Sequence, residues 1–287
     1  MKKLFGGINL TWPKLILFSI IAGLYGGFIA LLPAARDTSF TDMTVTFEVW
    51  ILFGIIIIMN SKSPLDSGLK CFIFFLISQP LIYIVQDVIT GSNLFHTYYR
   101  FWVLWTIACF PMGFIGYFMK KDKWWGVFIL IPILILLGEH YSAYLSKTMF
   151  SFPLHLLTTI FCFGTLILYP ICIFKNKIAR EIGLVTSITL IIIFTFLTIK
   201  NPPVYDTYLL SSGDKYTFDD SYKAYLEDSK YGDMDIVYDQ DTWTIHVVFK
   251  KAGNTKFILE SPDGKKRTFK IKIERDYYDF KEIKNKD

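Results

Sequence analysis

Long apolar runs separated by short polar segments fill the first 199 residues of the chain. A helix needs about 20 mostly apolar residues to cross the hydrocarbon core of a bilayer, and seven runs reach that length. The predicted membrane spans are Lys14–Ala35, Thr41–Asn60, Leu69–Thr90, Tyr98–Met119, Trp124–Ser146, Phe150–Phe174 and Ala179–Ile199. The pattern therefore predicts an α-helical polytopic membrane protein with seven transmembrane helices.

After Ile199 the pattern changes to an alternation of apolar and polar residues. Pro202 and Pro203 stop the last helix, and Trp243–Phe249 then shows a period of two, which is typical of a strand with one buried face. Further strands are predicted at Lys215–Phe218 and Met234–Tyr238, and apolar faces continue at Phe257, Leu259, Phe269, Ile271 and Ile273. The turn Ser261-Pro262-Asp263-Gly264 has the residues of a hairpin connection. The domains are predicted at residues 1–199 (transmembrane), 200–203 (Pro-rich connector) and 204–287 (small all-β domain).

Composition supports this division. Residues 1–199 contain 14 Lys and Arg and 8 Asp and Glu, whereas residues 200–287 contain 16 and 17. Such a split excludes a single soluble domain, a disordered chain and a nucleic-acid binder of the basic-patch kind. The lipid bilayer is the partner that the apolar part requires, and no nucleic acid is expected.

Charge in the short loops predicts the orientation. Eleven Lys and Arg flank the spans on one side and only Arg36, Arg100 and Lys147 lie on the other, which places the N-terminus in the cytoplasm and the C-terminal domain outside the cell. Richness in Ile, Phe, Lys and Tyr favours a bacterial plasma membrane. The head Met1-Lys2-Lys3 also allows a cleaved signal peptide, but its apolar run is longer than usual, so we expect an uncleaved first helix.

The ending resembles bacterial immunoglobulin-like domains. The resemblance rests on the segment from Gly253 to Leu259, the turn Asp263-Gly264-Lys265 and the run from Thr268 to Ile273. It implies a β-sandwich of the kind used on cell surfaces for adhesion, spacing or contact with a protein partner. It implies no active-site residues, because a fold does not specify a function.

Ionisable residues inside membrane spans are candidates for a functional site, because burying a charge in a bilayer is unfavourable. Nearly all of them fall in the predicted outer halves of the spans: Glu48, Asp87, Arg100, Glu139, His140 and His155. Helical spacing also predicts two polar faces, one in the third span and one in the sixth. The first contains Gln79, Tyr83 and Gln86, and the second contains His155, Thr158, Cys162, Thr165 and Tyr169.

Two explanations of these residues stay open. Hydrogen bonds between helices, with an ion pair from Arg100 to Asp87 or Glu139, would only stabilise the bundle. Alternatively, the residues line an outward-facing cavity in which Asp87 or Glu139 accepts a proton, His155 titrates and Arg100 holds an anion.

No motif identifies a reaction, a metal or a cofactor. Zinc-protease, Walker and nucleophile-elbow signatures are missing, so we predict no cofactor and no metal ligands. All four cysteines lie in spans, which excludes a disulfide in the β domain. The acidic pairs Asp233/Asp235 and Asp239/Asp241 lack EF-hand spacing and are interpreted as a solvated strand edge.

The leading hypothesis is a non-enzymatic membrane protein that presents the β domain for surface interaction, sensing or envelope assembly. The alternative is a membrane-embedded enzyme or transporter with a polar site in the outer leaflet. An accessory subunit of a larger complex is a third interpretation.

Overall fold

The computed structural model describes residues 4–283 apart from residues 46, 122, 214, 240 and 276. The described part of the chain contains seven helices that are long and apolar enough to cross a membrane, so the protein is a multi-pass membrane protein by helix length and composition. The seven predicted spans are confirmed. The helices cover Trp12–Leu31, Ser39–Met59, Pro64–Thr90, Leu94–Lys120, Trp124–Phe150, Leu156–Ile173 and Lys177–Lys200.

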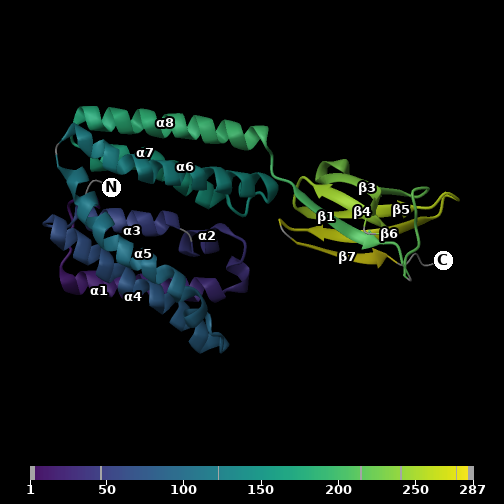
Figure 1. Ribbon diagram of the computed structural model, residues 1–287, viewed down its shortest axis with the longest axis horizontal. Helices are drawn as coiled ribbons and strands as arrows, with labels where there is room; N and C mark the ends of the chain where they lie inside the picture. The colour runs from purple at the N-terminus through teal and green to yellow at the C-terminus, as the bar shows by residue number, and fades with distance from the viewer. Residues whose placement is uncertain are drawn as a thin grey trace. The chain divides into compact units, whose positions relative to one another are not determined.

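Some of these spans consist of more than one helical segment, and the segments are labelled in Figure 1. The second span consists of two helices, α2 and α3, and short 3₁₀ turns extend the fourth and fifth spans. The α-helices are α1 (Trp12–Leu31), α2 (Ser39–Val45), α3 (Phe47–Met59), α4 (Pro64–Thr90), α5 (Leu94–Gly116), α6 (Val127–Phe150), α7 (Leu156–Ile173) and α8 (Lys177–Lys200).

The limits of α4 follow from local chemistry. Ser63 lies before the first turn, where its hydroxyl accepts a hydrogen bond from the Asp66 amide at 3.1 Å, and Pro64 needs no such partner because it has no N–H. Gly91 ends the helix in the left-handed conformation, with φ at 68°. Sequence signals at both ends therefore determine where this helix starts and stops.

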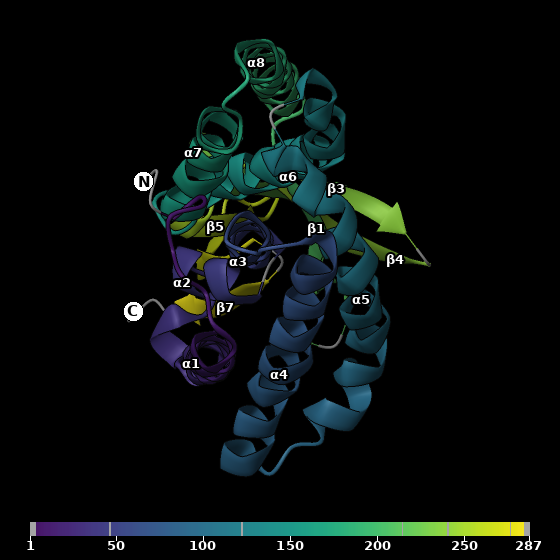
Figure 2. The same cartoon turned by 90° about the vertical axis from the view of Figure 1, so that its left-hand side faces the viewer.

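Small residues bring α1 against α4. A Cβ atom on Gly23 would lie 2.6 Å from the backbone oxygen of Ser78, and one on Gly27 would lie 2.8 Å from Cβ of Val85. The two helices can approach this closely because these positions have no side chain. Looking along the bundle, Figure 2 shows α3 between α7 on one side and α1 and α4 on the other, and α3 contacts both α4 and α7. The helix α3 therefore lies between other helices of the bundle.

The chain divides into two compact units, and the second of them includes part of a helix. The first unit comprises Met1–Tyr144 and Leu154–Phe196, and the second comprises Leu145–Pro153 and Leu197–Asp287. The last turns of α6 therefore belong with the β-strands.

Seven described strands form two antiparallel sheets in the second unit. One sheet has the order β1-β4-β3 and the other has the order β2-β5-β6-β7. The strands are β1 (Tyr205–Ser211), β2 (Lys223–Leu226), β3 (Gly232–Asp239), β4 (Thr242–Phe249), β5 (Gly253–Glu260), β6 (Lys266–Ile273) and β7 (Tyr278–Ile283). An immunoglobulin constant domain instead places its first, second, fifth and fourth strands in one sheet, so the resemblance is not confirmed.

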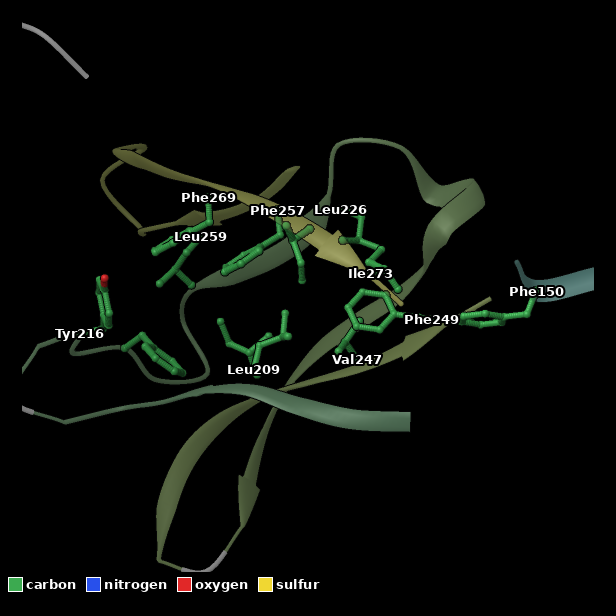
Figure 3. Packing of buried hydrophobic residues seen from close by; sticks show 13 residues of the cluster. Phe150, Leu209, Tyr216, Leu226, Val247, Phe249, Phe257, Leu259, Phe269 and Ile273 are labelled. Atoms are coloured by element: carbon green, nitrogen blue, oxygen red, sulfur yellow. The ribbon is translucent and has the colours of Figure 1, made fainter. Parts of the chain in front are cut away.

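The alternation of residues in β4, β5 and β6 produces the core between the sheets. Val247 and Phe249 point toward Phe257 and Phe269 (Figure 3). The rings of Phe257 and Phe269 stack on each other with their centroids 4.4 Å apart. The hairpin at Ser261–Gly264 is confirmed, with Gly264 at φ 82°.

One predicted strand is wrong. The segment Lys215–Phe218 forms no strand, although Tyr216 and Phe218 are both buried. Both aromatic rings fill the core while the backbone pairs with loop atoms: the Gly213 amide donates to the Tyr216 carbonyl, and the Phe218 amide donates to the Ser212 hydroxyl. Burial of alternate residues can therefore occur without a neighbouring strand.

Candidate functional site

The six ionisable residues predicted from the spans do not meet at one point. Glu48 and His140 contact each other, His155 contacts Asp42, which is not one of the six, and Glu139 is the chain neighbour of His140.

Glu48 and His140 join the second and fifth spans. The Nδ1 atom of His140, on α6, is hydrogen-bonded to Oε1 of Glu48, near the start of α3. Glu48 is 1% exposed and His140 is half-buried. The second carboxylate oxygen, Oε2, is also buried and has no hydrogen-bond partner among the described residues. One oxygen of a membrane-buried carboxylate is therefore available for a proton or a small ligand.

Asp42 and His155 join the second and sixth spans. The Nδ1 atom of His155, which precedes α7, lies 2.6 Å from Oδ2 of Asp42 on α2, and the Thr158 hydroxyl donates to the same oxygen at 3.2 Å. Asp42 is 7% exposed and His155 is 4% exposed. The pair is buried and its shared carboxylate oxygen has two partners.

Ser39 extends this cluster by tying the start of α2 to the start of α7. Its hydroxyl donates to the Leu154 carbonyl at 3.0 Å and accepts from the Thr158 amide at 3.2 Å. A free amide in the first turn of a helix commonly takes such a hydroxyl as its acceptor. Asp42 thus lies in a network of fixed donors, which is what a buried carboxylate requires.

Asp42 is not among the six predicted residues, although it lies inside the predicted second span. Its position near the end of an apolar run resembles that of an interfacial residue, which the bilayer does not penalise. The available signal was a second carboxylate in the span that contains Glu48. The spacing of six residues turns a helix by about 240° beyond a full turn, so the two carboxylates face different neighbours, His155 before α7 and His140 on α6.

The predicted polar face of the sixth span is confirmed as a buried face of α7. All five residues of this face are buried: His155, Thr158, Cys162, Thr165 and Tyr169. α7 contacts both helices of the second span, α2 and α3. The polar face of α7 therefore packs on the second span.

Asp87 lies between two consecutive helices. It lies in the last turn of α4, where its carboxylate accepts hydrogen bonds from the amides of Leu94 and Phe95 at 2.7 and 2.9 Å. Those amides belong to the first turn of α5, which has no partners for them within the helix. Asp87 therefore connects two consecutive helices.

Arg100 and Glu139 are exposed on the surface of the helical unit. Among the described residues no ion pair joins Arg100 to Asp87 or to Glu139. Carboxylate–histidine pairs join different spans of the bundle instead.

The cavity that lies against the second span is apolar. A cavity of about 150 Å³ lies beside Phe18, Tyr25, Trp50 and Phe53, and it is lined almost wholly by apolar atoms. Within the described ranges, no group of three or more His, Cys, Asp or Glu side chains could hold a metal ion.

The β domain carries charged groups of two kinds. Asp233 and Asp235 lie on β3, an edge strand, where Asp233 forms an ion pair with Lys250 at 2.5 Å. On the four-stranded sheet, Lys256 is opposite Lys270, and Lys270 is opposite Lys281. Like charges on three neighbouring strands form a basic face on this sheet.

No family model, curated protein sequence or solved structure matches this chain. Its function must therefore be inferred from its own residues.

Proposed function

We propose that this chain is a membrane-anchored binding protein whose C-terminal β domain contacts a partner outside the cell. In this proposal the seven helices anchor the domain in a bacterial plasma membrane, with the N-terminus in the cytoplasm. The uneven distribution of Lys and Arg in the loops supports the orientation. A sandwich of seven short strands is a common binding scaffold, which supports an immunoglobulin-like role in surface interaction, sensing or envelope assembly.

One observation carries the proposal. Glu48, His155 and Asp87 each bond to a group on another helix, and Glu48 and His155 have different partners, so these predicted residues form separate contacts. Side chains that bind and convert a substrate converge on one accessible point, which these do not. The β domain, by contrast, has a continuous charged face.

Complementation tests this proposal in a bacterial strain that lacks the protein. The full chain and a chain that ends at residue 203 are expressed at equal levels in the membrane, and growth of the strain under envelope stress is compared. We expect the full chain to restore growth and the shortened chain to fail. Restoration by the shortened chain would show that the function lies in the helices.

Orientation is tested separately with a thiol reagent that does not cross membranes. The β domain has no native cysteine, so Lys265→Cys introduces a single exposed thiol there, and Lys121→Cys serves as the matched control in a loop on the opposite side. We expect labelling of the first variant and not the second in intact cells. The reverse result would invert the proposed topology.

A second function is favoured by one specific observation, the unpartnered Oε2 atom of Glu48. A buried carboxylate with one free oxygen, held by a histidine, is suited to bind a proton or a cationic solute in the membrane. This is the outer-leaflet site of an enzyme or transporter, with Glu48 and His140 in place of the predicted Asp87 or Glu139.

Glu48→Gln tests the second function, with Glu139→Gln as the control on the neighbouring exposed carboxylate. Loss of growth in the first variant alone, at a normal amount of folded protein, would favour a site. Loss of folded protein would show that the pair is structural, because removing one member of a buried ion pair leaves the other unpaired.

A further inference from the structure

The outward face of the four-stranded sheet carries an arrangement of lysines that folding does not explain. Lys256 of β5, Lys270 of β6 and Lys281 of β7 are directly opposite one another in the antiparallel register. In the next row, two residues along, Lys272 lies between Asn254 and Asp279. Like charges directly opposite on neighbouring strands destabilise a sheet. This row therefore opposes folding.

Nearby acids neutralise this face only in part. Lys256 forms an ion pair with Glu227 at 3.0 Å, and Lys272 forms one with Glu274 at 2.6 Å. Lys270 and Lys281 are exposed and have no ion pair with any described residue. The centre of the row is thus left with uncompensated positive charge.

The same residues line a shallow hollow of about 500 Å³ between the two rows. Four lysines, Lys256, Lys270, Lys272 and Lys281, contribute to its walls, against two acids, Glu227 and Asp279. The opposed lysines of the row follow one another at the spacing of neighbouring strands, about 4.8 Å, so a linear partner that crosses the strands can contact them in turn. The arrangement therefore favours a linear partner.

The type of residue indicates how the partner is recognised. Lysine binds phosphate as a flexible point charge, while arginine provides a planar fork that selects one geometry. The four basic residues that line the hollow are all lysines. Binding here would depend on charge density and would weaken with salt.

We propose that the lysine hollow of the β domain binds a linear polymer that carries repeated phosphate groups. This proposal rests on the proposed function of the β domain as a binding module and names the class of its partner. An extended polyanion neutralises several lysines of the row at once. This binding offsets the repulsion between the opposed lysines.

Binding of fluorescent inorganic polyphosphate to the full chain tests the proposal, with the protein held in nanodiscs of neutral lipid and fluorescence anisotropy as the readout. We expect the triple variant Lys256→Gln, Lys270→Gln and Lys281→Gln to bind at least ten-fold more weakly than the unmodified chain. Lys265→Gln is the control, since it removes one exposed charge in the β5–β6 turn and should leave the affinity unchanged. Affinity should fall as salt is raised from low to physiological concentration.

Thermal unfolding separates loss of binding from loss of structure. The triple variant should unfold at the same temperature as the unmodified chain or at a higher one, because opposed positive charges have been removed. Equal polyphosphate affinity in the triple variant and the unmodified chain would overturn the proposal. Binding to vesicles that contain phosphatidylglycerol, without binding to polyphosphate, would overturn it in favour of a lipid surface.

The two proposals fail in different ways. If polyphosphate does not bind but the chain ending at residue 203 still fails to restore growth, the β domain has another partner and only the polyanion proposal is wrong. If that shortened chain restores growth, the proposed function itself is wrong.

Discussion

Phe150 offers a sharp test of how the β domain is built. It is the last residue of α6, is 1% exposed, and belongs to the core between the two sheets. Figure 3 shows its ring at the edge of this core, next to Phe249. Its carbonyl oxygen also accepts a hydrogen bond from the Ala252 amide at 2.9 Å. The other described members of this core lie between residues 209 and 273, so one large side chain is supplied from far away in the sequence.

The substitution Phe150→Ala should destabilise the second unit substantially. Replacing a buried phenylalanine by alanine costs about 3–5 kcal/mol, because apolar contacts are lost and a cavity remains. The ring lies at the edge of the core, where neighbours can close in, so we expect a value of about 3 kcal/mol. Since about 1.4 kcal/mol corresponds to a factor of ten, the unfolded population of the unit should rise by roughly 150-fold. The hydrogen bond to Ala252 should persist, because it uses only the backbone.

Hydrogen–deuterium exchange on the full chain in detergent measures this effect. Peptides from β4 and β6 should exchange about 100-fold faster in Phe150→Ala than in the unmodified chain, since core amides exchange through opening of the whole unit. The matched control is Phe152→Ala, because Phe152 lies two residues further on and is 66% exposed. Peptides from α3 and α4 should be unchanged in both variants.

Equal protection of β4 and β6 in the two variants would refute this reasoning. The β domain would then close its core without Phe150, and the end of α6 would be only a neighbour. Faster exchange in α3 and α4 as well would instead indicate damage to the whole protein.

Three further predictions follow from local geometry. Gly23→Ala should lower the melting temperature of the helical unit, because the added Cβ would lie 2.6 Å from a backbone oxygen of α4. The control Gly54→Ala should leave the melting temperature unchanged, because a Cβ there has nothing within 4 Å. Equal melting temperatures of the two variants would argue against this close packing. The Ser261 hydroxyl donates to Asp263 and lowers the pKa of that carboxyl group to about 2, so this pair stabilises the fold above pH 4 and the stabilisation is lost as pH falls from about 4 toward 2. Ser261→Ala should raise this pKa, measured by NMR titration, and acid unfolding of the β domain should begin at a higher pH; an unchanged pKa would contradict the assignment. Lys270→Gln should increase the free energy of unfolding of the β domain by about 0.2–1 kcal/mol, because it removes the middle one of three opposed positive charges. A decrease in the thermal stability of this variant would contradict the prediction.

The sequence predicts the membrane helices well because few backbone conformations are stable in a bilayer. A run of apolar residues in hydrocarbon must satisfy its backbone hydrogen bonds internally, so length and hydropathy are sufficient to locate a helix such as α8. The strands β4, β5 and β6 are equally readable, since the alternation of Val247 and Phe249 with polar residues reports one buried face. Lys215–Phe218 shows the limit of this reasoning, because burial of alternate residues does not require a partner strand.

The candidate site was predictable only in part. Burial of a polar face on the sixth span follows from helical spacing, because residues at steps of three and four share one side. The choice of partner does not follow, since Asp42 and His155 are 113 residues apart and meet only when α2 packs on α7. Asp87 likewise has the same local context as a catalytic acid, yet it accepts hydrogen bonds from the start of α5.

What the sequence determined by itself is therefore the local part of the structure: seven membrane helices, the change to strands after Ile199, and the alternating apolar positions of β4, β5 and β6. Only the tertiary structure decided that Glu48 pairs with His140, that Leu145–Pro153 joins the β-strands, and that lysines of three strands stand in one row. The physical reason is that each residue's hydropathy and backbone preference act along the chain. Pairing, in contrast, depends on which faces meet after the helices and sheets have packed.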